Sequence, residues 1–334
     1  PAGNAFVYEY DATTKKLRQL VDVKQLLDLP KGHYAPGKIH SRIDMGSDGW
    51  LYFATHRGST RVTTDEYHYK GDWIIRHHPG KGKTEIVKQA PVPKHCIPTS
   101  VLDPERLIFY GGTAAGNRKD PVMFFAYDIR NDKVRHTVEH GPHRYLIFSR
   151  STGRAYYVNA EEGELMRYDP STDKGPQPMG VTLGLRAATE ETSDGYVYTA
   201  ARSKEKGDAT IWRFNTKTEK VDKIGSAAVG NETYITTIDV DPTGRYLYYI
   251  PGAHGGSWRD GTTVIQFDVK TGKKKIIAFL HPVLKEKVGY VPIGTYGSAL
   301  SPEGDKLYIT WNGNRAGLSD RGKYDFDTTA LTVI

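Results

Sequence analysis

The sequence predicts an all-β protein, a β-propeller built from four-stranded antiparallel blades. One tight-turn hairpin recurs about every 50 residues along the 334-residue chain, and a second kind of hairpin lies between successive copies. The chain also contains 35 Gly and 18 Pro, which suits many short strands joined by turns. Because two hairpins make one four-stranded sheet, each repeat is predicted to be one blade.

The first hairpin runs from Ile39 to His56. Ser47-Asp48-Gly49 has the composition of a tight turn, and Trp50-Leu51-Tyr52-Phe53 is typical of a buried strand. A hairpin brings its open ends together, so His40 and His56 are expected to lie near each other. The turn recurs at 103–106, 151–154, 193–195, 241–245 and 301–305, each time followed by an aromatic or aliphatic strand.

The second hairpin begins with an aromatic strand that usually ends in Asp or Asn and continues into a polar turn rich in Thr, Lys and Gly. Its copies begin at 7–11, 73–76, 124–128, 165–169, 211–215 and 264–268. No segment between the repeats is predicted to form a helix of useful length, which makes a β-sandwich the weaker alternative.

The repeats predict a single domain, 1–334, with incomplete terminal blades. Five blades are complete between about Ile39 and Val283. The chain opens on a second hairpin and closes at 330–334 in what is predicted to be a third strand. If the two ends form one blade the propeller has six, and if each belongs to its own blade it has seven. The extra strand at the end favours seven.

Charge and composition limit the classes of partner that the protein is expected to bind. The formal net charge is +7 and the pI is about 9.1, which favours anionic partners. No recognition-helix pattern or basic tail indicates nucleic acid binding, and no apolar run approaches the roughly 18 residues of a membrane span. The first four residues do not resemble a signal peptide. A single cysteine, Cys96, excludes an internal disulfide.

Histidines gather at one end of the predicted strands, in loops that are longer and richer in Arg, Tyr and Trp than the turns at the other end. Long loops on a rigid scaffold commonly carry function. Any one of these histidines could be an ordinary core or loop residue, whereas the set favours a site. The candidate catalytic residues are His40, His56, His95, His143, His254 and Tyr296.

This set of side chains suits β-elimination on a uronic-acid polysaccharide. That reaction needs a group to neutralise the substrate carboxylate, a base to remove the adjacent proton and an acid to protonate the leaving oxygen. Guanidinium groups match carboxylate or sulfate, and aromatic rings stack on sugars. The candidate substrate-binding residues are Arg57, Arg61, Arg144, Arg186, Tyr234, Trp258, Tyr290 and Trp311.

Other chemistries remain open. Converging imidazoles could hold a divalent metal such as Zn, Mn or Ca, although the sequence leaves the cofactor unknown. A metal-dependent hydrolase or oxidoreductase is therefore one alternative, and a non-catalytic binding or assembly module is another. Glycoside hydrolysis ordinarily needs two paired carboxylates, and no persuasive pair is present.

The chain resembles bacterial β-propellers along nearly its whole length. The resemblance rests on Ser47–Phe53 and on the Tyr-Asp-x-x-Thr-x-Lys hairpins at Tyr10–Lys16 and Tyr168–Lys174. The His, Tyr and Arg content of the loops is similar to that of the seven-bladed polysaccharide lyases acting on ulvan, oligogalacturonate or rhamnose-glucuronate linkages. This resemblance implies a secreted or periplasmic lyase in which histidines, a tyrosine and arginines act, sometimes beside a structural metal.

Overall fold

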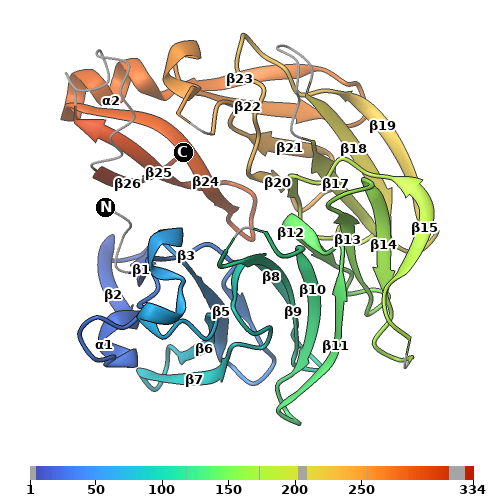
Figure 1. The fold of residues 1–334 in the computed structure, drawn as a ribbon. Coiled ribbons are helices and arrows are strands. Elements are labelled where there is room, and N and C mark those ends of the chain that lie inside the picture. The colour runs from blue at the N-terminus through green and yellow to red at the C-terminus, as the bar shows by residue number, and fades with distance from the viewer. Residues whose placement is uncertain (1–4, 118, 173, 202–208, 254, 316–327) are drawn as a thin grey trace. The chain divides into compact units, whose positions relative to one another are not determined.

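The computed structural model describes residues 5–117, 119–172, 174–201, 209–253, 255–315 and 328–334. The chain divides into two compact units, 1–180 and 181–334, and each unit is described by itself (Figure 1). The predicted single domain, 1–334, stays a prediction. His254 lies outside the described residues, and of His143 only the backbone is described.

Unit 1 contains a two-stranded ribbon and three blades. The ribbon pairs β1 (Phe6–Asp11) with β2 (Lys16–Asp22), and the short helix α1 (Val23–Leu27) follows. The first blade contains β3 (Lys38–Ile39), β4 (Asp44–Met45), β5 (Leu51–His56), β6 (Trp73–His78) and β7 (Lys83–Gln89). The second contains β8 (His95–Asp103), β9 (Ile108–Ala115), β10 (Met123–Asp128) and β11 (Lys133–Glu139). The third contains β12 (Pro142–Phe148), β13 (Ala155–Asn159), β14 (Glu164–Tyr168) and β15 (Gln177–Thr182). Two 3₁₀ turns, η1 (Thr60–Val62) and η2 (Asp65–Tyr67), lie between β5 and β6.

Unit 2 contains three blades. They are β16 (Ala187–Ala188), β17 (Tyr196–Ala200), β18 (Thr210–Asn215) and β19 (Lys220–Ser226); β20 (Ile238–Val240), β21 (Tyr246–Tyr249), β22 (Thr263–Asp268) and β23 (Lys274–Phe279); and β24 (Tyr290–Leu300), β25 (Leu307–Arg315) and β26 (Thr328–Val333). The 3₁₀ turn η3 (Ser257–Asp260) and the helix α2 (Leu280–Val288) connect these strands.

The blades are those of a β-propeller, and there are six, not the seven predicted. All the described strand pairs are antiparallel, and the five complete blades appear where the repeat predicts them. The predicted last strand is confirmed as β26, which pairs with β25. The error lies at the other end, because β1 and β2 form only a two-stranded ribbon and do not add a seventh blade.

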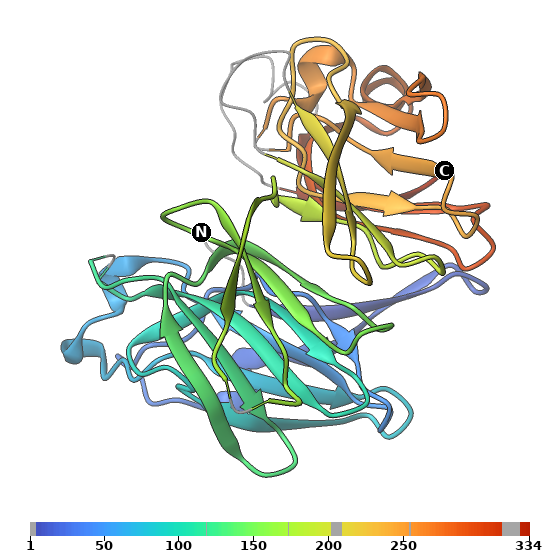
Figure 2. The ribbon, with the colours of Figure 1, turned by 90° about the vertical axis from the view of Figure 1, so that its right-hand side faces the viewer.

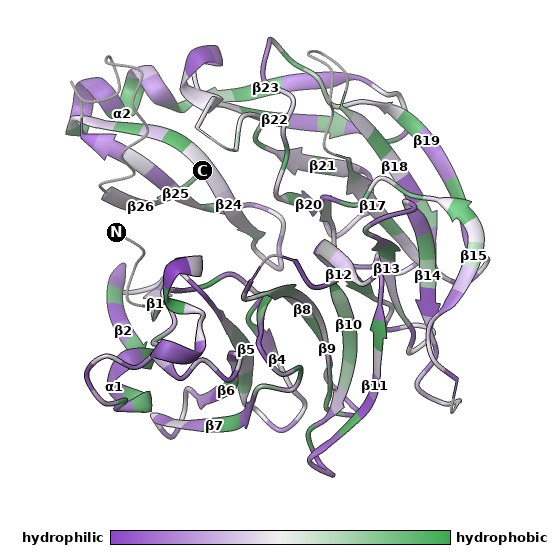
Figure 3. Cartoon of the chain, viewed as in Figure 1, coloured by the Kyte–Doolittle hydropathy of each residue, from purple (hydrophilic) through white to green (hydrophobic). Residues whose placement is uncertain are grey.

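The second blade shows how the sequence forms a sheet. Figures 1 and 2 show its strands side by side in a twisted ribbon, in the order β11-β10-β9-β8. In Figure 3, β10 is hydrophobic along much of its length, whereas the outermost strand, β11, carries many hydrophilic residues. Burial follows the same pattern, because four of the six residues of β10 are buried and none of β11 is. The outer edge strand is therefore the more polar of the two, whereas all nine residues of β8, at the inner edge of the sheet, are buried.

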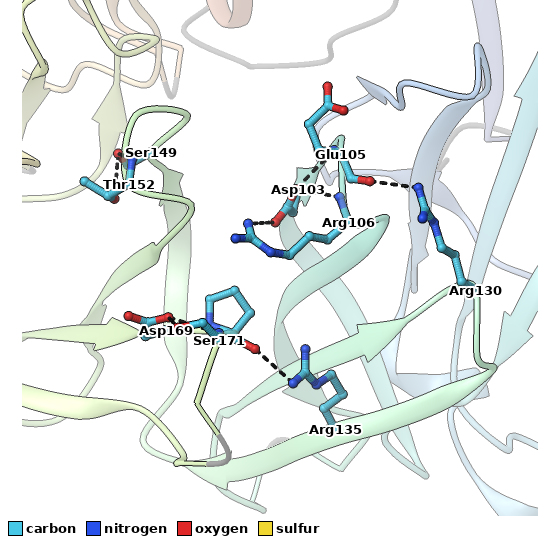
Figure 4. Close-up of polar contacts among 10 residues, drawn as sticks. Asp103, Glu105, Arg106, Arg130, Arg135, Ser149, Thr152, Asp169 and Ser171 are labelled. Atoms are coloured by element: carbon cyan, nitrogen blue, oxygen red, sulfur yellow. Dashed lines mark hydrogen bonds and ion pairs between the residues drawn. The ribbon is translucent and has the colours of Figure 1, made fainter.

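Side chains of the recurrent turn hold it in shape. Asp103 Oδ1 accepts hydrogen bonds from the backbone N–H groups of Glu105 (3.1 Å) and Arg106 (3.0 Å). Its Oδ2 accepts one from Arg106 Nη1 at 2.9 Å (Figure 4). An Asp at the first turn position that bonds the following N–H groups is the expected turn chemistry. We call the end of the blades that carries these turns the turn end, and the opposite end the loop end.

A helix of useful length was not predicted. The nine-residue helix α2 (Leu280–Val288) follows β23, where the sequence was expected to continue without a useful helix. Pro282 lies in its first turn, where a proline is tolerated, and Gly289 ends the helix in the left-handed conformation at φ 63°. Neither helix of the described residues is long and apolar enough to cross a membrane.

Candidate functional site at the loop end of unit 1

The opening hairpin brings its two histidines together, as the sequence predicts. Lys38 pairs with His56 and Ile39 with Thr55 in the β3–β5 ladder. The centroids of the His40 and His56 rings are 5.5 Å apart.

His40 lies where the innermost strand of the first blade is interrupted. The chain leaves the ladder between β3 and β4, and β8 carries an irregularity between Cys96 and Thr99. At that irregularity the Pro98 carbonyl oxygen lies 2.8 Å from His40 Nδ1. Because a carbonyl can only accept, Nδ1 carries the proton, and in the neutral ring Nε2 holds the lone pair.

His56 is held in the same tautomer. Its Nδ1 is bonded to the Arg57 carbonyl oxygen, so Nε2 again holds the lone pair. The residue is 9% exposed. Burial, followed by the positive charge of Lys38, lowers the pKa of His56 to about 2, so the imidazole is neutral at any physiological pH.

Arg57 is fixed beside these rings. It is 9% exposed, and its Nη1 donates to Cys96 Sγ (2.6 Å) and to the Ala114 carbonyl oxygen (3.0 Å). Burial raises the pKa of the Cys96 thiol to about 11, so the sulfur stays protonated and is not a reactive thiolate. Cys96 therefore serves to orient the guanidinium.

Two further cations complete the group. Lys38 and Arg144 are both exposed. Protein atoms nevertheless crowd the Lys38 amine, and this crowding, followed by the positive charges of Arg144 and Arg57, lowers its pKa. We call Lys38, His40, His56, Arg57, Cys96 and Arg144 the loop-end cluster.

A buried carboxylate lies next to the loop-end cluster. Asp72 is fully buried and accepts hydrogen bonds from the hydroxyl groups of Tyr34 (2.8 Å), Tyr69 (3.3 Å) and Thr55 (2.5 Å). Burial raises the pKa of Asp72 to about 6, although the three hydroxyl donors and the charge of Arg57 oppose this. The three cations of the loop-end cluster thus have one buried carboxylate beside them, which acts on Arg57, so the cations outnumber the nearby carboxylate.

The remaining candidates of unit 1 lie outside the loop-end cluster, or their side chains are not among those described. His95 is buried, its Nδ1 is 2.7 Å from Thr113 Oγ1, and burial lowers its pKa. The charge of Arg57 acts on His95 as well, which places it near the cluster. Arg61 lies exposed in η1. His143 belongs to β12, and its side chain is outside the described residues.

Most of the other candidates belong to unit 2. Arg186 donates from Nε to the Tyr234 hydroxyl at 2.6 Å, and its guanidinium lies 5.1 Å from that ring's centroid. The indole of Trp258, in η3, meets the ring of His281 edge-on at 6.1 Å. Tyr296 in β24 is 37% exposed, and His254 lies outside the described residues.

Two aromatic candidates of unit 2 are core residues. Trp311 is 1% exposed, packs with Ile309 and donates from Nε1 to Thr332 Oγ1 at 2.8 Å. Tyr290 belongs to the same hydrophobic cluster. Both side chains are accounted for by packing, and the site proposed below does not include them.

Sequence reasoning missed three members of this arrangement. Strand register places Lys38 there, and Cys96 and Asp72 are buried beside it. No sequence motif indicates either register or burial. The one available signal for Lys38 was its place two residues before His40, on the strand that pairs with the one carrying His56.

The expectation of a divalent metal stays a prediction. Among the described residues, no group of three or more His, Cys, Asp and Glu side chains lies together as metal ligands would.

Comparison with known proteins establishes the fold. No protein-family model matches the chain, and no curated protein matches its sequence. A Bacteroides uniformis protein that carries a provisional 6-phosphogluconolactonase name superposes with a TM-score of 0.60 at 11% identity, covering 100% of this chain and 95% of that one. An oligogalacturonate lyase in complex with manganese superposes with a TM-score of 0.56 at 10% identity, covering 98% of this chain and 81% of that one. At such identities the likeness is one of fold alone.

Proposed function

We propose that the protein is a polysaccharide lyase that cleaves a uronic-acid polymer by β-elimination, and that the loop-end cluster of unit 1 is its active site. The observation that carries the proposal is the gathering of three cations, Lys38, Arg57 and Arg144, around the neutral imidazole of His56 and the neighbouring ring of His40. A secreted or periplasmic location is proposed with it, because the polymer is extracellular.

The cations would bind the uronate carboxylate. Arg57 is held by Cys96 and by a backbone carbonyl, so it is oriented before the substrate arrives. Neutralising the carboxylate lowers the barrier to removing the proton on the adjacent carbon, because charge delocalises onto that group in the transition state. A positively charged site also attracts a polyanion.

The imidazoles would accept that proton. His56 presents its Nε2 lone pair, and its Nδ1–H is fixed on a backbone carbonyl. In the free protein burial, followed by the positive charge of Lys38, lowers the pKa of His56 to about 2, which makes it a weak base. An arriving carboxylate would offset Lys38 and Arg57 and raise this pKa, so the base would strengthen only when substrate is bound.

The direct test is ultraviolet absorbance of the unsaturated uronate that elimination forms. Purified protein is incubated with a panel that includes polygalacturonate, ulvan and polymers with rhamnose-glucuronate linkages. The fold it shares with an oligogalacturonate lyase makes polygalacturonate the first substrate to try. We expect the absorbance to rise with one polymer.

The other outcomes separate the alternatives. Binding without any rise in absorbance would make the protein a non-catalytic binding module. Activity that a chelator abolishes, with no unsaturated product, would indicate the metal-dependent hydrolase or oxidoreductase.

A further inference from the structure

We propose that Lys38 is the general acid of this reaction, and that its ammonium protonates the leaving glycosidic oxygen while His56 Nε2 takes the proton from carbon. This inference rests on the proposed function and adds to it a catalytic residue that the sequence motifs do not identify. Lys38 would contact the substrate oxygen directly.

Strand register places the two groups side by side. Lys38 and His56 are directly opposite each other in the antiparallel β3–β5 ladder. Residues in such a pair point to the same face, with Cβ atoms about 4.5–5.5 Å apart. Lys38 is exposed, so its amine is accessible to a substrate, and its charge acts on the His56 ring. An acid and a base separated by this distance can act on two neighbouring carbons of one sugar ring.

The other groups of the site are poor proton donors. Arg57 and Arg144 keep their protons at any working pH. The Cys96 thiol has a pKa raised to about 11 and contacts both Arg57 and the Ala114 carbonyl.

The two nearby tyrosines are also poor donors. The hydroxyl groups of Tyr34 and Tyr69 donate to Asp72, and burial raises the pKa of both well above its usual range. The proton of His40 is held on the Pro98 carbonyl through Nδ1, so among the loop-end cluster and the residues packed behind it Lys38 is left as the donor.

The electrostatics of Lys38 suit an acid. Crowding of the amine, followed by the charge of Arg144, favours loss of its proton; Cys96 opposes this, and the charge of Arg57 adds to it. An ammonium with a lowered pKa releases its proton more readily than an ordinary lysine does. The same residue therefore contributes charge to carboxylate binding and a proton to bond cleavage.

The proton balance closes within the pair. His56 Nε2 accepts the C5 proton, the C5–H electron pair forms the C4=C5 double bond, and the C4–O bond breaks as its oxygen takes the Lys38 proton. The products are an unsaturated uronate and a free hydroxyl group, with no change in oxidation state. His56 is left protonated and Lys38 neutral, so transfer between the opposed side chains restores both.

The leaving group distinguishes an acid from a residue that only binds. We would compare wild type with Lys38→Arg on the polymer and on a uronate whose O4 carries 4-nitrophenyl, a leaving group that needs no protonation. Arginine keeps the positive charge but cannot donate the proton. We expect kcat/KM on the polymer to fall at least about 100-fold, and on the nitrophenyl ether by no more than about threefold. Lys88→Arg, on the outer strand β7, is the matched control and should change neither.

A pH profile provides the second readout. Wild-type activity should fall at high pH with an apparent pKa below the roughly 10.4 of free lysine, and Lys38→Arg should lack this limb. If Lys38→Arg lowers kcat/KM equally on both substrates, or on neither, the assignment of Lys38 is overturned and the lyase proposal still stands. A wild type that eliminates from neither substrate would instead overturn the lyase proposal, and the role of Lys38 with it.

Discussion

The two ends of the blades in unit 1 use arginine in opposite ways. At the turn end, Arg106 pairs with Asp103 of its own turn, while Arg130 and Arg135 donate to the backbone carbonyls of Glu105 and Pro170 (Figure 4). At the loop end, Arg57 donates to a thiol and a carbonyl and, among the described residues, pairs with no carboxylate there. The charge of Arg144 lowers the pKa of Lys38, and the charge of Lys38 lowers the pKa of His56.

This difference separates scaffold from site. The turn-end pairing recurs with the repeat. In unit 1 Arg154 donates to Asp169 at 3.1 Å, and at the equivalent position in unit 2 Arg245 donates to Asp268 at 2.8 Å. Such pairs link the two hairpins of one blade. Within the part of the chain that the structure describes, the loop-end cluster has no counterpart in the other blades, and it carries excess charge, which costs stability unless an anion binds. Excess charge that the repeat does not require indicates function.

The largest expected effect comes from removing the base. His56→Ala should lower kcat/KM on the active polymer at least about 100-fold, because it removes the group that accepts the carbon-bound proton. His77→Ala is the matched control. His77 is also buried and has a hydroxyl partner, Thr84 at 2.9 Å, but it lies toward the turn end of the same blade. Equal loss in both variants, measured as initial rates of absorbance change, would argue against a loop-end site.

The next largest effect is expected at Asp72, in the pH dependence of the free energy of unfolding. The folded pKa of Asp72 is about 6, above its ordinary value of 3.8, so the folded protein holds this proton more tightly than the unfolded chain. The resulting stabilisation is complete below pH 3.8 and is lost as the pH rises through about 6. Relative to Asp72→Asn, which does not titrate, the wild-type free energy of unfolding should fall by about 3 kcal/mol across this range. Urea unfolding at several pH values measures it, and parallel curves would contradict the raised pKa.

The smallest effect is expected at the turn end. Arg106→Ala removes an ion pair whose carboxylate, Asp103, keeps its two backbone N–H donors. We expect a loss of stability of about 1 kcal/mol or less, since the Arg106 side chain is 46% exposed, and no change in kcat/KM. A marked loss of activity in this variant would remove the distinction between the two ends.

The sequence predicted what depends on local pattern. The turn chemistry of Ser47-Asp48-Gly49 and the strand after it are short-range signals, so the hairpin and the approach of His40 to His56 follow from them. The number of blades depends on what the terminal strands pair with, which no local pattern specifies. The helix at Leu280–Val288 was missed because its N-cap residue, Phe279, makes no side-chain cap hydrogen bond.

The site was harder to predict than the fold, for two reasons. Aromatic residues serve both cores and sugar-binding sites, and only burial shows that Trp311 packs in the core. Lys38, Cys96 and Asp72 act through cross-strand register and through contacts with Arg57, whose partners are 39 or more residues away along the chain. A sequence read in order does not show such contacts.

The central claim is that the loop-end cluster binds a uronate carboxylate, and isothermal titration tests it most directly. The titrants are galacturonate and glucuronate oligomers, each as the free acid and as the methyl ester, with wild type and with Arg57→Met. We expect wild type to bind one acid at least about tenfold more tightly than its ester, salt to weaken this binding, and Arg57→Met to remove the preference. Equal affinity for acid and ester, or a preference that survives in Arg57→Met, would contradict it.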